Sequence, residues 1–321
     1  MTAKSDESRE RSLSTLKYAM GVDILKYMQD KDVFEIIVNP DHKLWVDTFG
    51  QGKIYTGIEI HPDTSKQIIY SAAAISGQVI TSDFPMLEAE LPDSDSFESS
   101  RFQGLLPGVV TDPAFNIRKH PQRILTLDHY VQQGVMTEHQ KEIIVQAIHD
   151  KKNIIAAGGT SSGKTTLLNA ILAEISKLTD RVIMIEDTKE LHCVAQDCVA
   201  LHTLKGVDMM ALLRSTLRLS PNRIVVGEIR GEEALALLDA WSTGHGGGCS
   251  TVHSNSAYDT LLRLENLTSR VAKNPQQITI GRAVDMVVYL KYSGLKRTLE
   301  EIIHVEGYDP LKKEYITQKI M

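Results

Sequence analysis

Eight consecutive residues near the middle of the chain have the types and spacing of a phosphate-binding loop. Segment 158–165 has the sequence GGTSSGKT and matches G-x-x-x-x-G-K-[ST] at every position. Glycines allow the backbone to turn several N–H groups toward a polyphosphate. Lys164 is expected to reach the β- and γ-phosphates, and the Thr165 hydroxyl is expected to bind Mg²⁺. The predicted nucleotide-binding residues are Gly158, Gly159, Thr160, Ser161, Ser162, Gly163, Lys164, Thr165 and Thr166.

The motif predicts a nucleotide but does not say what its energy drives. GTPases, small-molecule kinases, helicases and transport motors share the motif. The chain contains no N-K-x-D guanine-recognition sequence, which favours ATP. The alternative is a Gly/Ser turn followed by Lys-Thr by chance. A strand before the loop and a helix after it argue against that alternative.

Two further segments place carboxylates after short apolar runs. In the first, Glu228 follows the run 224–226 and Gly227. The Asp usual at the end of such a strand is absent, so Glu228 is the first choice for positioning water. A plain surface carboxylate is the alternative. In the second segment, Glu186 and Asp187 follow the run 182–185. Either carboxylate could supply the negative charge near Mg²⁺ that the absent Asp would have provided. Capping by Asp187 remains an open alternative. The expected Mg²⁺ ligands are Thr165, Glu186, Asp187 and Glu228.

Segment 243–253, TGHGGGCSTVH, has two histidines around a glycine-rich stretch. Cys249 with His245 and His253 gives three conceivable zinc ligands, but no fourth ligand or C-x-x-C pair lies nearby. We prefer a polar loop close to phosphate, in which the imidazoles sense the γ-phosphate through hydrogen bonds.

Three arginines are candidates for stabilising transferred phosphate. An arginine finger contributes about 10³- to 10⁵-fold in rate. Arg101 follows an acidic stretch, Arg118 ends the sequence FNIR, and Arg230 follows Glu228. Each also has the alternative role of a surface ion-pair residue.

The elements that must position these groups change character along the chain. From residue 138 onward, short β-branched runs alternate with helical patterns such as 138–150 and 164–178. This alternation predicts βαβ units and a parallel sheet. Before residue 126 a helix is predicted at 13–29 and a hairpin at 33–46, which indicates an α+β domain. The predicted organisation is an N-terminal α+β domain at 1–125 with frayed residues 1–12, a linker at 126–137 and an α/β, RecA-like P-loop domain at 138–321.

Composition excludes several classes of protein. The chain has 321 residues, a net charge of −6 and 42% hydrophobic residues, which is ordinary for a globular protein. No apolar run approaches the roughly 18 residues of a spanning helix, and the polar start is not a secretory signal. Three cysteines cannot form a disulfide framework, so a cytoplasmic location is expected. The charge gives no direct sign of DNA binding. The acidic excess lies before residue 131, with a cluster at 83–98 that we expect to be a solvated loop with at most a short strand near 87–91. A partner-docking or arginine-screening element is the alternative for this cluster.

Four boxes in fixed order resemble the secretion (traffic) ATPase superfamily. They are GGTSSGKTT, IEDTKEL, LRLSPNRIVVGEIRG and TGHGGGCSTVHSNS. Within it the chain is most similar to the type IV secretion and conjugal-transfer ATPases of the Trb-type conjugation branch. FEIIVNP, RFQGLLP and AFNIRKH resemble the N-terminal domain of that family. The four-cysteine zinc module of the type II secretion and pilus relatives is missing.

The resemblance implies an N-terminal α+β domain, a RecA-like ATPase domain and a homohexameric ring that binds ATP between the two domains. It implies nucleotide contacts by Arg101 and Arg118, the acidic-box role for Glu186 and the catalytic role for Glu228. It also assigns His245 and His253 to the histidine box. The stretch from Pro92 to Arg101 is longer than the compact P-D-G-x-R turn of relatives.

The same resemblance implies inner-membrane components of a conjugation apparatus as partners, and a peripheral position at the cytoplasmic face of the inner membrane. Two other functions stay open on the sequence. A nucleic-acid motor with the same core would need a basic channel or stacking aromatics. A scaffold that binds ATP for assembly would show no turnover.

Overall fold

The computed structural model describes residues 3–48, 52–92, 94, 97, 99–119, 125–204, 206–293 and 296–320. The chain divides into two compact units, Met1–Arg123 and Ile124–Met321. The segment 126–137, expected to be a linker, instead contains helix α3, Leu127–Gln132, and belongs to the second unit. Its buried Leu127 and Tyr130 explain the difference, because a solvated linker would not bury two large apolar side chains.

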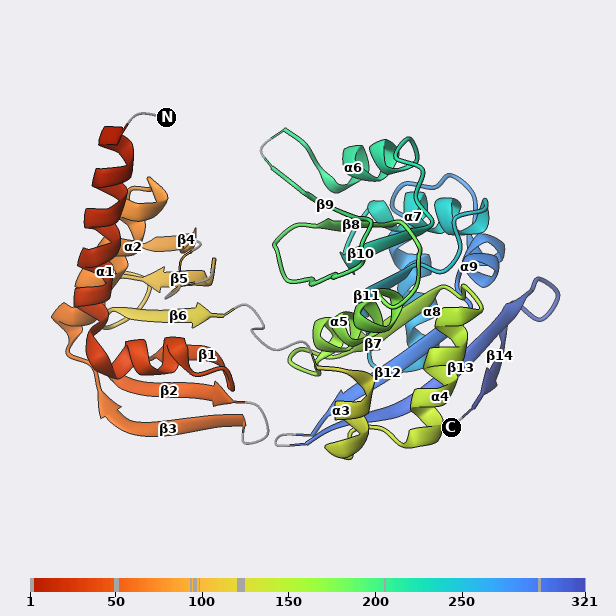
Figure 1. The fold of residues 1–321 in the computed structure, drawn as a ribbon, viewed down its shortest axis with the longest axis horizontal. Coiled ribbons are helices and arrows are strands. Elements are labelled where there is room, and N and C mark those ends of the chain that lie inside the picture. Colours follow the sequence, from red (N-terminus) through yellow and green to blue (C-terminus); the bar gives the residue numbers. More distant parts are fainter. Residues whose placement is uncertain are drawn as a thin grey trace. The chain divides into compact units, whose positions relative to one another are not determined.

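The first unit is a six-stranded antiparallel sheet covered on one face by two helices (Figure 1). The strand order is β3-β2-β1-β6-β5-β4. The helices α1 and α2 pack on the sheet face that presents Ile36, Phe102 and Phe115. The elements are α1 Ala3–Gln29, β1 Val33–Val38, β2 Lys43–Thr48, β3 Gly52–Glu59, α2 Pro62–Ser76, β4 Met86–Glu90, β5 Arg101–Leu105 and β6 Ala114–Arg118.

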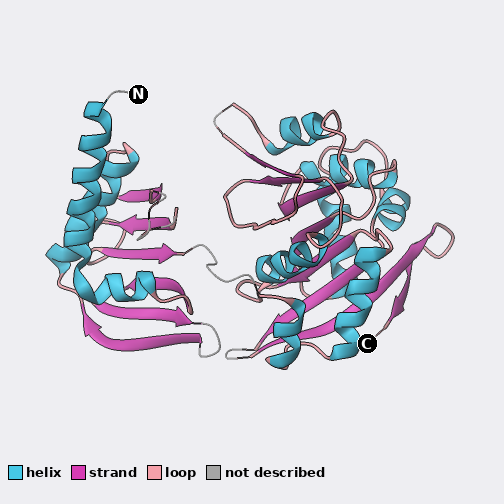
Figure 2. Ribbon diagram, viewed as in Figure 1, coloured by secondary structure: helices cyan, strands magenta, loops and turns pink. Residues whose placement is uncertain are grey.

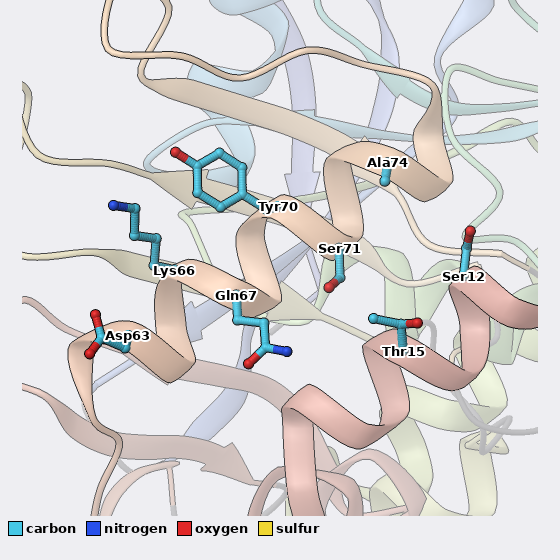
Figure 3. A pocket seen from close by; sticks show the side chains of 8 residues that line it. All are labelled: Ser12, Thr15, Asp63, Lys66, Gln67, Tyr70, Ser71 and Ala74. Carbon is cyan, nitrogen blue, oxygen red and sulfur yellow. The ribbon is translucent and has the colours of Figure 1, made fainter.

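Helix α1 begins at Ala3, ten residues before the predicted start, and is interrupted at Gly21 (φ 60°, ψ −178°). Residues 3–12 include the good helix formers Glu and Arg, two of each, with one Ala and one Lys, and they favour helix without producing an apolar stripe. Apolar periodicity alone therefore underestimated its length. Between α1 and α2 lies a groove of about 440 Å³ (Figure 3), lined mainly by polar side chains such as Thr15, Gln67 and Tyr70. None of the predicted site residues lines it.

The second unit has an eight-stranded sheet in the order β14-β13-β12-β7-β11-β10-β8-β9. The six strands from β12 to β9 run parallel to one another, and β13 and β14 are each antiparallel to their neighbours. The strands are β7 Ile154–Gly158, β8 Val182–Glu186, β9 Cys198–His202, β10 Arg223–Ile229, β11 Cys249–His253, β12 Met286–Tyr292, β13 Arg297–Asp309 and β14 Glu314–Lys319.

Helices cover both faces of this second sheet (Figure 2). The apolar side chains of α6 to α9 share one core with one face of the sheet. On the other face α5 contacts β7 and β11, and α3 and α4 pack against α5. The helices are α3, α4 Glu138–His149, α5 Lys164–Ile175, α6 Met209–Thr216, α7 Glu233–Ser242, α8 Ala257–Thr268 and α9 Gln277–Ala283.

Candidate nucleotide site

The phosphate loop lies between β7, which is buried at all five positions, and α5. At Gly158 an added Cβ would lie 2.4 Å from the Leu290 carbonyl oxygen and 2.5 Å from the Ser162 Oγ, so only glycine fits. Ser161 and Gly163 have φ values of 59° and 93°. The loop therefore has the tight, left-handed turns that a backbone anion cradle requires.

The N-terminus of α5 is left open to an anion. Its N-cap, Gly163, provides no side-chain hydrogen bond, and the first turn contains no acidic residue. The first intrahelical bond runs from the Leu167 N–H to the Gly163 carbonyl. The start of α5, with the positive end of its helix dipole, is therefore suited to binding phosphate. Nearby, the buried Ser162 Oγ has no hydrogen-bond partner among the described residues.

Lys164 and His253 meet at this loop. The Lys164 Nζ donates to the Gly159 carbonyl at 2.9 Å and lies 3.4 Å from the His253 Nδ1. The His253 Nε2 lies 3.4 Å from the Thr160 Oγ1. An ammonium can only donate, so Nδ1 accepts and the imidazole is neutral with its proton on Nε2. Partial burial and the Lys164 charge lower the pKa of His253, which maintains this neutral form.

Glu228 lies close to this pair but is engaged. Its charge acts to raise the pKa of His253, against the larger opposing effects. The Arg230 Nε donates to the Glu228 Oε2 at 2.8 Å, and a second guanidinium nitrogen contacts the same oxygen. Glu228 first, and then Asp187 and Glu190, raise the pKa of Arg230. A shift in the β10–β11 register between Val226 and Ile229 places Gly227 and Glu228 in a bulge, which turns Glu228 out of the regular strand alternation.

Glu186 lies beside Gly227: a Cβ added to Gly227 would lie 3.4 Å from the Glu186 Cγ. The Glu186 side chain is only 3% exposed. Its Oε1 accepts the backbone N–H groups of Glu190 and Leu191 at 2.9 and 2.8 Å. It therefore anchors the loop that follows β8.

Asp187 is exposed and accepts a hydrogen bond from the Thr203 Oγ1 at 3.2 Å. No helix begins at Asp187, so the helix-capping alternative is not what the structure shows.

The donor set suits Mg²⁺ with ATP better than a protein-only metal site. Within the described ranges, no three His, Cys, Asp or Glu side chains gather so that they could hold a metal ion. Mg²⁺ is usually held by one or two protein groups together with phosphates and water. Thr165 at the loop and the carboxylates of Glu186 and Glu228 fit that arrangement. The zinc alternative finds no support in the fold, because Cys249 is buried in β11 and the length of that strand separates His245 from His253.

His245 does not join the site. β11 runs parallel to β7 from Cys249, opposite Ile154, to His253, opposite Gly158. His245 precedes this strand, so it lies at the sheet edge opposite the phosphate loop. Of the expected polar loop, His253 therefore lies beside the phosphate loop and the glycines before β11 do not. At Gly248 an added Cβ would lie 2.3 Å from the Ile224 carbonyl oxygen. The glycines of this stretch let the chain pack closely against strand backbone at that edge.

Arg101 and Arg118 belong to the first unit and face each other across β5 and β6. They form the middle of a row of charged residues that crosses all six strands on the face away from α1 and α2. We call it the charged row. In strand order its members are Lys53, Asp47, Glu35, Arg118, Arg101 and Glu90.

Two arginines of the second unit escaped the sequence analysis. Arg297, at the start of β13, donates from its Nε to the Ser161 carbonyl at 3.0 Å. Arg263, on α8, is close enough for its charge to lower the pKa of His253. Neither belongs to a recognisable motif, and each is separated from the phosphate loop by about a hundred residues or more, so no local signal marked them.

Comparison with known proteins identifies the family of this chain. The sequence pattern of the Type II/IV secretion system protein family matches residues 23–292. Conjugal transfer protein TrbB of Rhizobium radiobacter is 43% identical over 303 residues, which cover 94% of this chain and 92% of the relative. Type IV secretion system protein VirB11 of Bartonella quintana is 27% identical over 91% of this chain and 93% of the relative. The chain therefore belongs to the Type II/IV secretion system protein family, and the secretion-ATPase resemblance is confirmed.

Solved structures show the same fold. The pilus retraction motor PilT with bound ADP has a TM-score of 0.61 and 18% identity, covering 94% of this chain and 82% of that chain. The Legionella pneumophila ATPase DotB has a TM-score of 0.60 and 18% identity, covering 92% of this chain and 78% of that chain. These likenesses confirm the predicted α/β fold with its RecA-like domain and smaller N-terminal domain.

Proposed function

We propose that this protein hydrolyses Mg²⁺-ATP and uses the energy to drive conjugative type IV secretion, as pilus assembly or substrate transfer. The observation that carries the proposal is the complete phosphate loop with an uncapped helix N-terminus, next to Lys164, His253 and Glu228. Membership of the secretion family supports the choice of ATP-driven transport over other uses of the same motif.

In the proposed mechanism, Lys164 exchanges the Gly159 carbonyl for the β- and γ-phosphate oxygens. When Lys164 moves to the phosphates, the His253 Nδ1 loses its contact with the lysine ammonium. The imidazole ring can then turn toward the γ-phosphate. Glu228 positions the attacking water once it is released from Arg230. The ion pair with Arg230 keeps Glu228 occupied until then.

Mg²⁺ would neutralise the charge that develops on the phosphates. Thr165 and Glu228 are the residues we assign to it. Glu186 is not assigned as a direct ligand, because its Oε1 already accepts two backbone N–H groups. It would instead contribute negative charge from its position beside Gly227. Asp187 is exposed near Arg230 and is the weaker of the two acidic-box candidates.

For charge stabilisation we propose Arg118 and Arg101 of the first unit. Arg230 is committed to Glu228 and is better suited to controlling that carboxylate than to reaching phosphate. His245 is separated from the other site residues by the length of β11, so we propose no catalytic role for it within its own chain.

The proposed assembly is a homohexameric ring that works with inner-membrane components of a conjugation apparatus, at the cytoplasmic face of that membrane. The names of the conjugal-transfer and VirB11 relatives support this setting. None of the described helices combines the length and apolar character needed to cross a bilayer.

The decisive experiment removes the Lys164 ammonium. Lys164→Ala should lower ATP turnover by roughly 10- to 100-fold, because it removes a charged hydrogen bond to phosphate. Phosphate release is measured beside Lys177→Ala, which removes an exposed lysine paired with Glu174 and should keep wild-type turnover. Wild-type turnover in Lys164→Ala would refute the site. ATP binding without phosphate release by the wild type would favour a scaffold, and strong salt-sensitive stimulation by DNA would favour a nucleic-acid motor.

A further inference from the structure

The phosphate loop is flanked by two strands, and a side chain from each side reaches it. On one side β11 aligns His253 with Gly158, and His253 contacts Thr160 and Lys164. On the other side β12 aligns Leu290 with Gly158. The chain then leaves β12 at Tyr292 and returns in β13 at Arg297, its partner in the antiparallel register. The end of this β12–β13 hairpin therefore lies alongside the loop.

Arg297 lies against both the phosphate loop and Tyr292. Its Nε donates to the Ser161 carbonyl oxygen at 3.0 Å. Its aliphatic Cδ lies 3.5 Å from the position that a Cβ on Gly163 would occupy, so the side chain lies against the loop backbone. Its guanidinium lies over the Tyr292 ring, with the Cζ 4.9 Å from the ring centroid. The aromatic face and the loop thus hold the arginine between them.

Ser161 is the part of the loop that most needs such support. It is a non-glycine residue with φ 59°, a conformation that costs of order 1–3 kcal/mol. Ser161 is exposed, so packing does not hold it in place. The turn that contains it is closed by a long bond of 3.4 Å from the Ser162 N–H to the Gly159 carbonyl. A donor fixed on the Ser161 carbonyl opposes relaxation of this turn.

We propose that Arg297 is a positioning residue of the nucleotide site, which holds the phosphate loop in its binding conformation from the β12–β13 hairpin, with Tyr292 as its support. The inference rests on the proposed function, because it assumes that the loop binds ATP and ADP. Arg297 contacts the loop and not the reacting atoms, so it acts on nucleotide affinity more than on the chemical step.

The charge of Arg297 adds to the same effect. The guanidinium stays protonated at any working pH, so it contributes a fixed positive charge beside the N-terminus of α5. Within the described ranges, its two terminal nitrogens have no hydrogen-bond partner in the protein.

The test compares Arg297→Ala with Lys296→Ala, which removes a cation from the adjacent exposed position of the same hairpin. Binding of a fluorescent ADP analogue gives Kd, and phosphate release gives KM and kcat. Arg297→Ala should raise Kd and KM about fivefold to twentyfold, the loss of one charge-assisted hydrogen bond, and leave kcat within about twofold. Lys296→Ala should match the wild type. Arg297→Lys should recover part of the affinity, because an ammonium on a long side chain can still donate to the Ser161 carbonyl.

A second pair of variants covers the case in which Arg297→Ala fails to fold. Tyr292→Leu should weaken ADP binding, and Tyr292→Phe should not, because the ring supports the guanidinium and the hydroxyl does not. Unchanged Kd in Arg297→Ala, or an equal rise in Lys296→Ala, would overturn the proposal. So would a fall in kcat without a change in KM. These results differ from failure of the proposed function, in which the wild type itself would not bind ADP or Lys164→Ala would remain fully active.

Discussion

His253 is neutral because of its neighbours, and this neutrality connects the site to pH. Partial burial and the adjacent Lys164 ammonium disfavour the imidazolium form and lower its pKa below the ordinary 6.5. Its Nδ1 accepts from the lysine only while it is unprotonated. Protonation of His253 would place two cations 3.4 Å apart, and their repulsion would push the two side chains away from each other. The contact between Lys164 and His253 in the nucleotide-free loop therefore forms only at pH values above the pKa of His253.

Replacing His253 by a residue that does not titrate should change how stability depends on pH. Between the lowered folded-state pKa and 6.5, the unfolded chain binds more protons at this position than the folded chain. The free energy of unfolding contributed by neutral His253 is therefore fully present above pH 6.5 and is lost as the pH falls through the folded-state pKa of His253. The urea midpoint of nucleotide-free protein should fall more between about pH 7.5 and about pH 5.5 in the wild type than in His253→Gln.

The comparison contains its own control, because His253→Gln leaves all other histidines of the chain in place. Equal pH slopes in the wild type and His253→Gln would contradict the assigned neutral state. Adding ADP should reduce the difference, since a bound anion offsets the repulsion between the Lys164 ammonium and an imidazolium.

Helices, strands and loops specified by contiguous residues could be predicted from the sequence, whereas contacts that depend on which strands are neighbours could not. The strand, loop and helix around Lys164 could be predicted because one contiguous motif specifies all three. His245 was misassigned because two histidines eight positions apart look adjacent in sequence, whereas a strand between them carries them to opposite sheet edges. Arg297 was missed because its contact with Ser161 spans 136 residues and depends on the β7–β12 pairing.

The charged row of the first unit places two arginines side by side. Arg118 and Arg101 are directly opposed on neighbouring strands, an arrangement of like charges that is unfavourable by roughly 0.2–1 kcal/mol in a sheet. Glu35 and Glu90 lie at the outer sides of the pair. A sheet that keeps two adjacent arginines on an open face is suited to an anion larger than one carboxylate, and a polyphosphate is such an anion.

We therefore expect Arg118→Ala to reduce ATP turnover without reducing stability. The loss in kcat should be at least about tenfold, below the full value of a finger because Arg101 remains. The thermal midpoint should stay equal or rise, since the substitution relieves repulsion. Lys53→Ala, at the far end of the same charged row, is the matched control and should keep wild-type turnover. Unchanged phosphate release in Arg118→Ala would remove this arginine from the proposed site.

In the second unit, three cations of the candidate nucleotide site already contact other protein groups. Lys164 is the phosphate-loop lysine, Arg230 is paired with Glu228, and Arg297 is bound to the Ser161 carbonyl. The transition state of phosphoryl transfer needs further positive charge on the γ-phosphate side. We propose that Arg118 and Arg101 of the N-terminal unit, from the same chain or from a neighbouring copy, add to this charge. A closed ring repeats one such arrangement at every site.

This dependence predicts that nucleotide and assembly are coupled. Mg²⁺-ATP should shift the particle mass from that of one chain to that of six, because a nucleotide held by residues of two copies would stabilise their association. Glu228→Gln should hold the ring longest, since it keeps the phosphate contacts while removing the group assigned to water. Lys164→Ala should form fewer rings at the same nucleotide concentration. Light scattering of all three proteins with and without Mg²⁺-ATP measures the effect. A particle that remains a single chain in every condition would contradict the ring, and would leave the arginines of the first unit to act within their own chain.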